Sequence, residues 1–255
     1  MSKQEIAKRY MLFIISLFFS AMGVAVTKHG ELGVSPISSV ANVLSGKYTS
    51  LSLGMWLIIW NCMLILGQIL ILRKNFQVIQ LLQIPLSFIF GYFTDFGMWC
   101  MSFIPVNHYI VHLFLVLCGI FILGFGIALS VIANVIMNSG EAFVKAISDK
   151  ANKNFGNIKI GFDILCVLLS LSLSLILFQG KIIGTREGTI ISALLTGVVV
   201  KFFSHRLKSP LEEMLQACHP ISFPKKHDRN PQPHQLLQGE DKIYRYNGKL
   251  PHKGA

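Results

Sequence analysis

Two polar residues that interrupt long apolar stretches of this 255-residue chain are the first candidates for chemistry. Asn61 lies seven residues after Gly54, and Asp163 lies seven residues after Gly156. An ionisable group inside a membrane span is costly, so the groups that persist there usually face protein or water and often serve transport. Asn61 and Asp163 are therefore candidate substrate-binding residues, with hydrogen bonding between helices as the structural alternative.

Two short segments with polar starts are the next candidates. Residues 35–44 read SPISSVANVL, with a serine of the N-cap type followed by proline at the first helical position. Residues 138–147 read NSGEAFVKAI, in which the Asn and the Glu three residues later resemble a capping box. Helix N-termini carry unpaired N–H donors, which favours a substrate site, whereas the charges of the second segment favour a helix lying on the membrane surface. The candidate binding residues in these starts are Ser35, Ser38, Asn138, Ser139 and Glu141.

A glycine-rich loop at residues 180–189, GKIIGTREGT, is a third candidate. It lacks the Lys-Ser or Lys-Thr pair that follows the glycines of a P-loop, so nucleotide phosphate binding is not expected. Its broken backbone could present N–H groups to an anion or a substrate, and an ordinary tight turn is the alternative. The loop adds Thr185, Glu187 and Thr189 to the candidate substrate-binding residues.

The sequence contains no recognisable catalytic motif. Ser-His-Asp order, H-E-x-x-H, paired catalytic carboxylates and a Walker motif are all absent. His108 and His112 have no third ligand nearby in the sequence, and the five cysteines show no C-x-x-C spacing. We expect neither an enzyme nor a cofactor, a metal site or a disulfide.

The elements that must position these residues are helices in a membrane. Only 14% of the residues are charged and the mean hydropathy is +0.58, whereas a soluble domain carries about 25% charged residues. A crossing needs about 20 mostly apolar residues. Such runs cover residues 10–27, 48–72, 75–94, 96–140 (broken by PVNH at 105–108), 158–178 and, more briefly, 188–203. The sequence predicts an all-α integral membrane protein with about six transmembrane helices.

The net charge of +11 is distributed in a way that suits a membrane protein better than a nucleic-acid-binding one. With the N-terminus inside, Lys and Arg concentrate near residues 3–9, 73–74, 145–153 and 201–208, and few lie on the other side. This positive-inside pattern predicts that both termini are cytoplasmic. Residues 1–206 form the predicted transmembrane domain, and residues 207–255, rich in Pro and His, are predicted to be a polar, disordered cytoplasmic tail.

The two halves of the transmembrane domain resemble each other. GVAVT at 23–27 aligns with GIALS at 126–130, and QIPLSFIFG at 83–91 aligns with TIISALLTG at 189–197. The repeats span about 10–104 and 109–206, each with a short amphipathic or re-entrant helix after its first transmembrane segment. Since three spans per half is an odd number, the second half enters the membrane from the opposite side, which gives a 3+3 inverted repeat.

The motifs at particular positions resemble those of a known family. Gly-x-Ala at 23–25, Leu-Gly-x-Ser-Pro at 32–36, Gly-x6-Asn at 54–61 and Gly-Thr-x-Glu-Gly-Thr at 184–189 are similar to the YczE/YyaS/YitT family of bacterial membrane proteins. The resemblance covers residues 10–203. It implies a multi-spanning protein of the bacterial plasma membrane without an established substrate.

The repeat, the glycine breaks and the sparse polar groups predict a permease. We expect it to move an unidentified small solute across the bacterial cytoplasmic membrane by alternating access. The expected partners are the lipid bilayer and that solute; nucleic acid is not expected, and a homo-oligomer is left open. The alternative is a non-transporting adaptor, assembly or regulatory factor that acts through its cytoplasmic tail.

Overall fold

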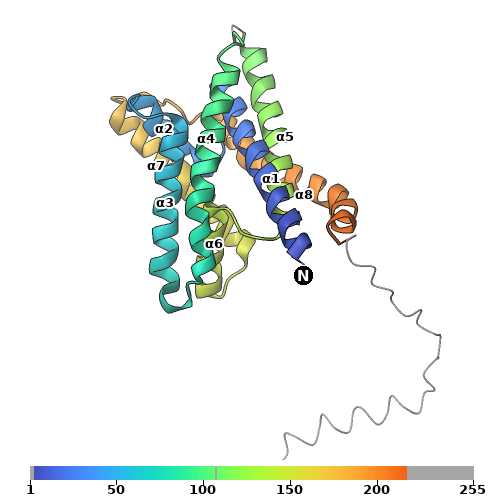
Figure 1. Ribbon diagram of the computed structural model, residues 1–255. Helices are drawn as coiled ribbons and strands as arrows, with labels where there is room; N and C mark the ends of the chain where they lie inside the picture. Colours follow the sequence, from blue (N-terminus) through green and yellow to red (C-terminus); the bar gives the residue numbers. More distant parts are fainter. Residues whose placement is uncertain (1–2, 107, 217–255) are drawn as a thin grey trace, which may run out of the picture. The chain divides into compact units, whose positions relative to one another are not determined.

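The computed structural model describes residues 3–106 and 108–216, and all regular structure in these ranges is helical (Figure 1). The all-α class predicted from the sequence is therefore confirmed. The elements in chain order are α1 (Lys3–His29), α2 (Pro36–Lys47), α3 (Leu53–Leu72), the 3₁₀ turns η1 (Arg73–Asn75) and η2 (Val78–Leu82), α4 (Gln83–Met101), α5 (Tyr109–Ala133), α6 (Ser139–Ala151), α7 (Phe155–Leu177) and α8 (Glu187–Gln216).

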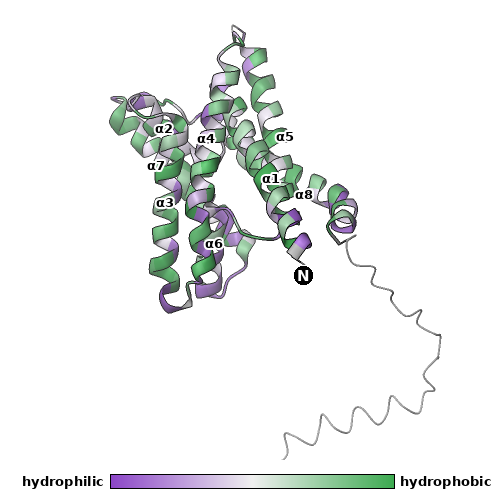
Figure 2. Ribbon diagram, viewed as in Figure 1, coloured by the Kyte–Doolittle hydropathy of each residue, from purple (hydrophilic) through white to green (hydrophobic). Residues whose placement is uncertain are grey.

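Six of these helices, α1, α3, α4, α5, α7 and α8, are long and apolar enough to cross a membrane, as predicted. Large apolar side chains such as Leu70, Ile176 and Leu194 are exposed along them, and Figure 2 shows hydrophobic residues over most of the length of α3 and α5. A helix satisfies its own backbone hydrogen bonds, so these apolar surfaces are stable in contact with lipid. The protein is embedded in a bilayer.

The last helix extends beyond the predicted boundary of the transmembrane domain. Helix α8 continues to Gln216, and it includes Pro210, which lacks an N–H for the helical ladder. Residues 207–216 of the predicted tail are therefore helical. The rest of that tail, residues 217–255, lies outside the described residues.

Helices α1 and α5 form the centre of the fold, and 61% and 56% of the residues in an apolar 18-residue stretch of each are buried. Small residues bring the two backbones close together. A Cβ on Gly23 would lie 2.6 Å from Cα of Leu123, and a Cβ on Gly126 would lie 2.5 Å from the backbone N of Ser20. Small residues are what membrane helices use for such close approach, because lipid offers no hydrophobic driving force between helices.

The two short helices are packed inside the bundle. Helix α2 packs mainly against α7, and α6 packs mainly against α3. Residues 36–43 of α2 are buried or half-buried throughout, and the first turn of α6 is buried or half-buried as well. The exposed charged residues of α6 all lie after this first turn: Lys145, Asp149 and Lys150. This burial fits helices that begin inside the protein better than helices that lie on the membrane surface.

Asp95, an acidic residue on the membrane-spanning helix α4, caps another helix. Its Oδ1 accepts a hydrogen bond of 2.8 Å from the backbone N–H of Gly54, and its Oδ2 accepts one of 2.5 Å from Oγ of Ser52. Ser52 is the N-cap of α3 and accepts in turn from the N–H of Met55. A carboxylate at a helix N-terminus satisfies otherwise unpaired donors and interacts favourably with the helix dipole.

Replacement of Asp95 by alanine is expected to destabilise the protein by about 1–2 kcal/mol, because N-cap interactions of this kind have that magnitude. Thermal unfolding of the detergent-solubilised variant measures the effect. The matched control is Asp149→Asn, since Asp149 is exposed and its ion pair in the described part of the chain is with Lys145, one helical turn earlier. Equal unfolding temperatures for Asp95→Ala and the control would contradict the capping role.

Candidate functional site

A cavity of about 570 Å³ lies inside the bundle, and all eight α-helices contribute residues to its wall. Its volume is within the range of small-molecule sites, roughly 300–1,000 Å³. The starts of both short helices reach it: Ser35 to Ser38 from the first half and Asn138 to Glu141 from the second. Seven of the candidate residues from the sequence line this cavity: Ser35, Ser38, Asn61, Asn138, Ser139, Glu141 and Asp163.

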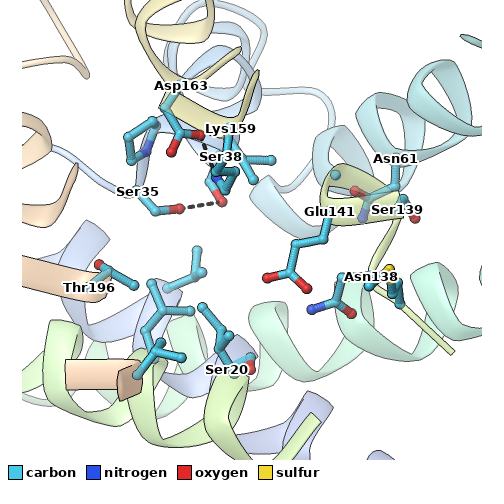
Figure 3. Close-up of a pocket in the computed structure, with 18 of the residues that line it drawn as sticks. Ser20, Ser35, Ser38, Asn61, Asn138, Ser139, Glu141, Lys159, Asp163 and Thr196 are labelled. Atoms are coloured by element: carbon cyan, nitrogen blue, oxygen red, sulfur yellow. Dashed lines mark hydrogen bonds and ion pairs between the residues drawn. The ribbon is translucent and has the colours of Figure 1, made fainter. Parts of the chain in front are cut away.

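The polar groups near the start of α2 form two pairs (Figure 3). The Ser35 hydroxyl donates a hydrogen bond of 3.0 Å to Oγ of Ser38. Lys159 and Asp163, one turn apart on α7, form an ion pair of 2.5 Å between Nζ and Oδ1. Their side chains are only 27% and 21% exposed, so the pair is partly shielded from solvent.

The start of α6 differs from the capping box predicted for it. Asn138 is the N-cap as expected, with the same φ of −57° and ψ of 148° as Ser35, but neither side chain accepts a capping hydrogen bond. Figure 3 shows the Glu141 side chain extending into the cavity from the start of α6. The reciprocal bonds of a capping box are therefore absent, and the Glu141 carboxylate is presented to the cavity instead.

Glu141 forms no hydrogen bond or ion pair with the part of the chain that the structure describes. Burial raises the pKa of this carboxyl, the positive charge of Lys159 opposes the rise, and the negative charge of Asp163 adds to it. Desolvation disfavours the charged form of a carboxyl group. An acid in this position can bind a proton at higher pH than an exposed glutamate.

Buried amides hold the start of α6 in place. Gln68 on α3 donates hydrogen bonds of 3.0 Å to Oε1 of Gln83 and 3.1 Å to the carbonyl O of Ser139. The hydroxyls of Ser87 and Ser139 lie 3.3 Å apart. Both glutamines are almost fully buried, and buried amides with partners of this kind specify one arrangement. The network therefore positions the residues that face the cavity.

Three candidate residues, Thr185, Glu187 and Thr189, do not line the cavity. Residues 187–189 of the predicted loop form the first turn of α8, and the backbone N–H of Gly188 there donates a hydrogen bond of 2.8 Å to the carbonyl O of Leu32. Gly33, next to Leu32, has φ +119°, a conformation that favours glycine. The loop therefore clamps the Leu-Gly turn, and this N–H is already used within the protein. Thr185 and Glu187 line a separate hollow of about 320 Å³ between the loop and α7.

Several cavity residues were not singled out from the sequence. Lys159 had one usable signal, because its spacing of four from Asp163 favours an ion pair on one helix face. No sequence pattern indicated Ser20, since a serine among apolar residues of a membrane helix is common. The other residues that the sequence did not indicate include Phe13, Trp60, Gln83, Ser87, Phe90, Phe155, Ser192 and Thr196.

Comparison with known proteins assigns the family. The profile of DUF6198, a family of unknown function, matches residues 7–205. The chain belongs to the DUF6198 family. This DUF6198 member is also 25% identical over 201 residues to the uncharacterized membrane protein YczE of Bacillus subtilis (strain 168). The aligned region covers 78% of the chain and 87% of the relative.

The comparison confirms the predicted resemblance to YczE, whereas the resemblance to YitT stays a prediction. No solved structure gives a significant match to this DUF6198 member. The relative is a membrane protein by name, which agrees with the six helices of this chain that are long and apolar enough to cross a membrane.

Proposed function

We propose that this protein is a permease that moves a small solute by alternating access between its two halves. The observation that carries the proposal is the central cavity, where the buried starts of α2 and α6 meet an ion pair and a carboxylate. Secondary transporters place their binding sites near the bilayer midplane, at the interface of two repeats and beside interrupted helices. The cavity has helix starts and charged side chains in its wall, as such sites do.

Reciprocal contacts between α1 and α5 support an internal repeat. In the alignment of the two halves, Gly23 corresponds to Gly126 and Ser20 corresponds to Leu123. Gly23 lies against the backbone of Leu123, and Gly126 lies against the backbone of Ser20. Pairs of this kind are expected at a two-fold axis, where each contact recurs with its members exchanged. The packing of α2 on α7 and of α6 on α3 follows the same exchange.

The two halves differ in one pair of equivalent helices. Helix α3 packs along α4, whereas α7 makes little contact with α8. Two copies of one repeat in different conformations are what alternating access requires, since the halves exchange conformations when the cavity opens to the other side. The looser pair, α7 and α8, is the proposed route into the cavity in this state.

Basic residues at one end of the bundle support cytoplasmic termini. Arg9 donates a hydrogen bond of 3.2 Å to the carbonyl O of Ala133 at the end of α5, and Lys150 donates one of 3.4 Å to Ile71 at the end of α3. The starts and ends of several helices thus gather on one side with their positive charges. The positive-inside rule assigns that side to the cytoplasm of a bacterial plasma membrane.

Uptake of solutes into proteoliposomes tests the proposal. Vesicles that contain the protein are incubated with a bacterial metabolite extract, and mass spectrometry measures which solutes enter them. We expect at least one solute to accumulate at least tenfold above empty vesicles, and Ser38→Trp, which fills the cavity, to abolish this accumulation. Asp149→Asn, outside the cavity, should match the wild type. If no solute distinguishes the protein from empty vesicles, the permease proposal is wrong.

A further inference from the structure

The charged residues in the cavity wall are one base, Lys159, and two acids, Asp163 and Glu141. Lys159 and Asp163 pair with each other, which leaves the Glu141 carboxylate as the charged group without a partner among the described residues. The cavity therefore carries a net charge of minus one when Glu141 is ionised and no net charge when it is protonated. Glu141 lies in the first turn of α6, where the helix dipole favours a negative charge, but no positive side chain pairs with it among the described residues. A positive ligand would neutralise the ionised state.

Two residues of the same wall, Ser20 and Trp60, carry a buried polar atom without a hydrogen-bond partner among the described residues. Ser20 is 2% exposed, its Oγ has no hydrogen-bond partner among the described residues, and it lines the cavity. The Oγ of Ser20 lies against Gly126 at the contact between α1 and α5, so Ser20 adds polarity to this wall without exposing its hydroxyl to a ligand in this conformation. Figure 3 shows Ser20 on the side of the cavity that faces Glu141.

The remaining wall favours an organic ligand. Four aromatic side chains, Phe13, Trp60, Phe90 and Phe155, line the cavity together with many aliphatic ones. Aromatic faces attract organic cations through the quadrupole of the ring. A divalent metal needs several acidic or histidine ligands, and within residues 3–106 and 108–216 no group of three such residues is close enough to hold one.

We propose that Glu141 is the shared site of a proton and a monovalent organic cation, so that the permease exchanges one for the other. The inference rests on the proposed function and names its solute class. The carboxylate binds either the cation or a proton, and binding of the cation releases the proton to the solvent. Each exchange keeps the cavity neutral, so the protein never moves an uncompensated charge through the bilayer.

The surroundings of Glu141 leave few other groups that could produce this pH dependence. Lys159 and Asp163 face it from α7. The span of α3, the other helix packed against α6, contains no Asp, Glu, Lys, Arg or His from Leu53 to Leu72. On α4, the acidic residue Asp95 is engaged at the start of α3. On α6 itself, Asp149 pairs with Lys145.

Binding of radiolabelled tetraphenylphosphonium to the purified protein between pH 5 and 9 tests this proposal. The probe has no proton of its own, so any pH dependence belongs to the protein. We expect affinity to rise up to tenfold per pH unit below the pKa of Glu141 and to level off above it, with up to one proton released per cation bound. Glu141→Gln should weaken binding at least tenfold and remove the pH dependence, whereas Asp149→Asn should bind as the wild type does.

Tetraphenylborate, an anion of nearly the same shape, is the ligand control and should not bind more tightly at high pH. Affinity for the cation that does not change with pH, equal affinity for the anion, or unchanged binding by Glu141→Gln would each overturn the assignment. Because the measurement needs no flux, a positive result together with failed solute accumulation would reject the permease and keep the site. Solute accumulation without cation binding would keep the permease and reject the cation site at Glu141.

Thermal unfolding gives a second readout that does not depend on ligand. Since burial raises the pKa of Glu141, the folded protein binds this proton more tightly than the unfolded chain does. The resulting stability is present at low pH and is lost as pH rises through the pKa of the folded state. We expect Glu141→Gln to unfold near the wild-type temperature at pH 5 and above it at pH 8. A difference that shrinks as pH rises would contradict an ionisable, unpaired Glu141.

Discussion

Gly23→Leu is expected to prevent the protein from folding. A Cβ at this position would lie 2.6 Å from Cα of Leu123, an atom that cannot move away without shifting α5. Overpacking a core by a few methylenes already costs about 1–3 kcal/mol, and here the obstacle is backbone at the centre of the bundle, so we expect a loss above about 3 kcal/mol. Size-exclusion chromatography of a fluorescent fusion should show the variant in the void volume or absent.

The matched control for this substitution is Gly161→Leu. Gly161 lies on the membrane-spanning helix α7, and a Cβ there would have no neighbour within 4 Å. This control should elute as a monodisperse peak with the wild-type unfolding temperature. Gly126→Leu, at the corresponding position of the second half, should fail as Gly23→Leu does. A monodisperse Gly23→Leu protein would show that α1 and α5 do not pack as closely as described.

The second large effect is expected for Asp163→Leu, which should reduce uptake of the solute found in proteoliposomes to background. The substitution removes a polar group of the cavity and leaves the Lys159 ammonium without its partner. Breaking a fully buried pair costs about 3–5 kcal/mol. Because this pair is partly exposed, we expect a smaller loss of about 2 kcal/mol. Uptake and thermal unfolding are both measured, since the first reports on function and the second on folding.

A double variant separates these two effects. Lys159→Met combined with Asp163→Leu removes both charges, so it should recover most of the lost unfolding temperature while uptake stays at background. Asn61→Leu, at a cavity-lining position of α3, should also abolish uptake with little change in stability. Wild-type uptake by both Asn61→Leu and Asp163→Leu would remove these residues from the transport mechanism.

The sequence by itself predicts the class of the fold and the number of its spans. Whether a helix can cross a bilayer depends on its length and on its apolar content, which are local properties of the chain. Helix starts at Ser35 and Asn138 were predictable for the same reason, because cap residues and neighbouring proline or glycine act within one turn. The ion pair of Lys159 and Asp163 was also within reach, through its spacing on one helix.

Only the tertiary structure decided which of the polar residues meet. The loop containing Gly188 and the start of α6 both looked suitable for binding, but the carbonyl of Leu32, far away in the sequence, occupies the N–H of the loop. The pattern of Asn138 and Glu141 fits a capping box, yet the cavity beside α6 and the positive charge on α7 leave the carboxylate pointing inward. A cavity is made by the packing of helices that are distant in the chain, so its lining depends on contacts that no local pattern contains.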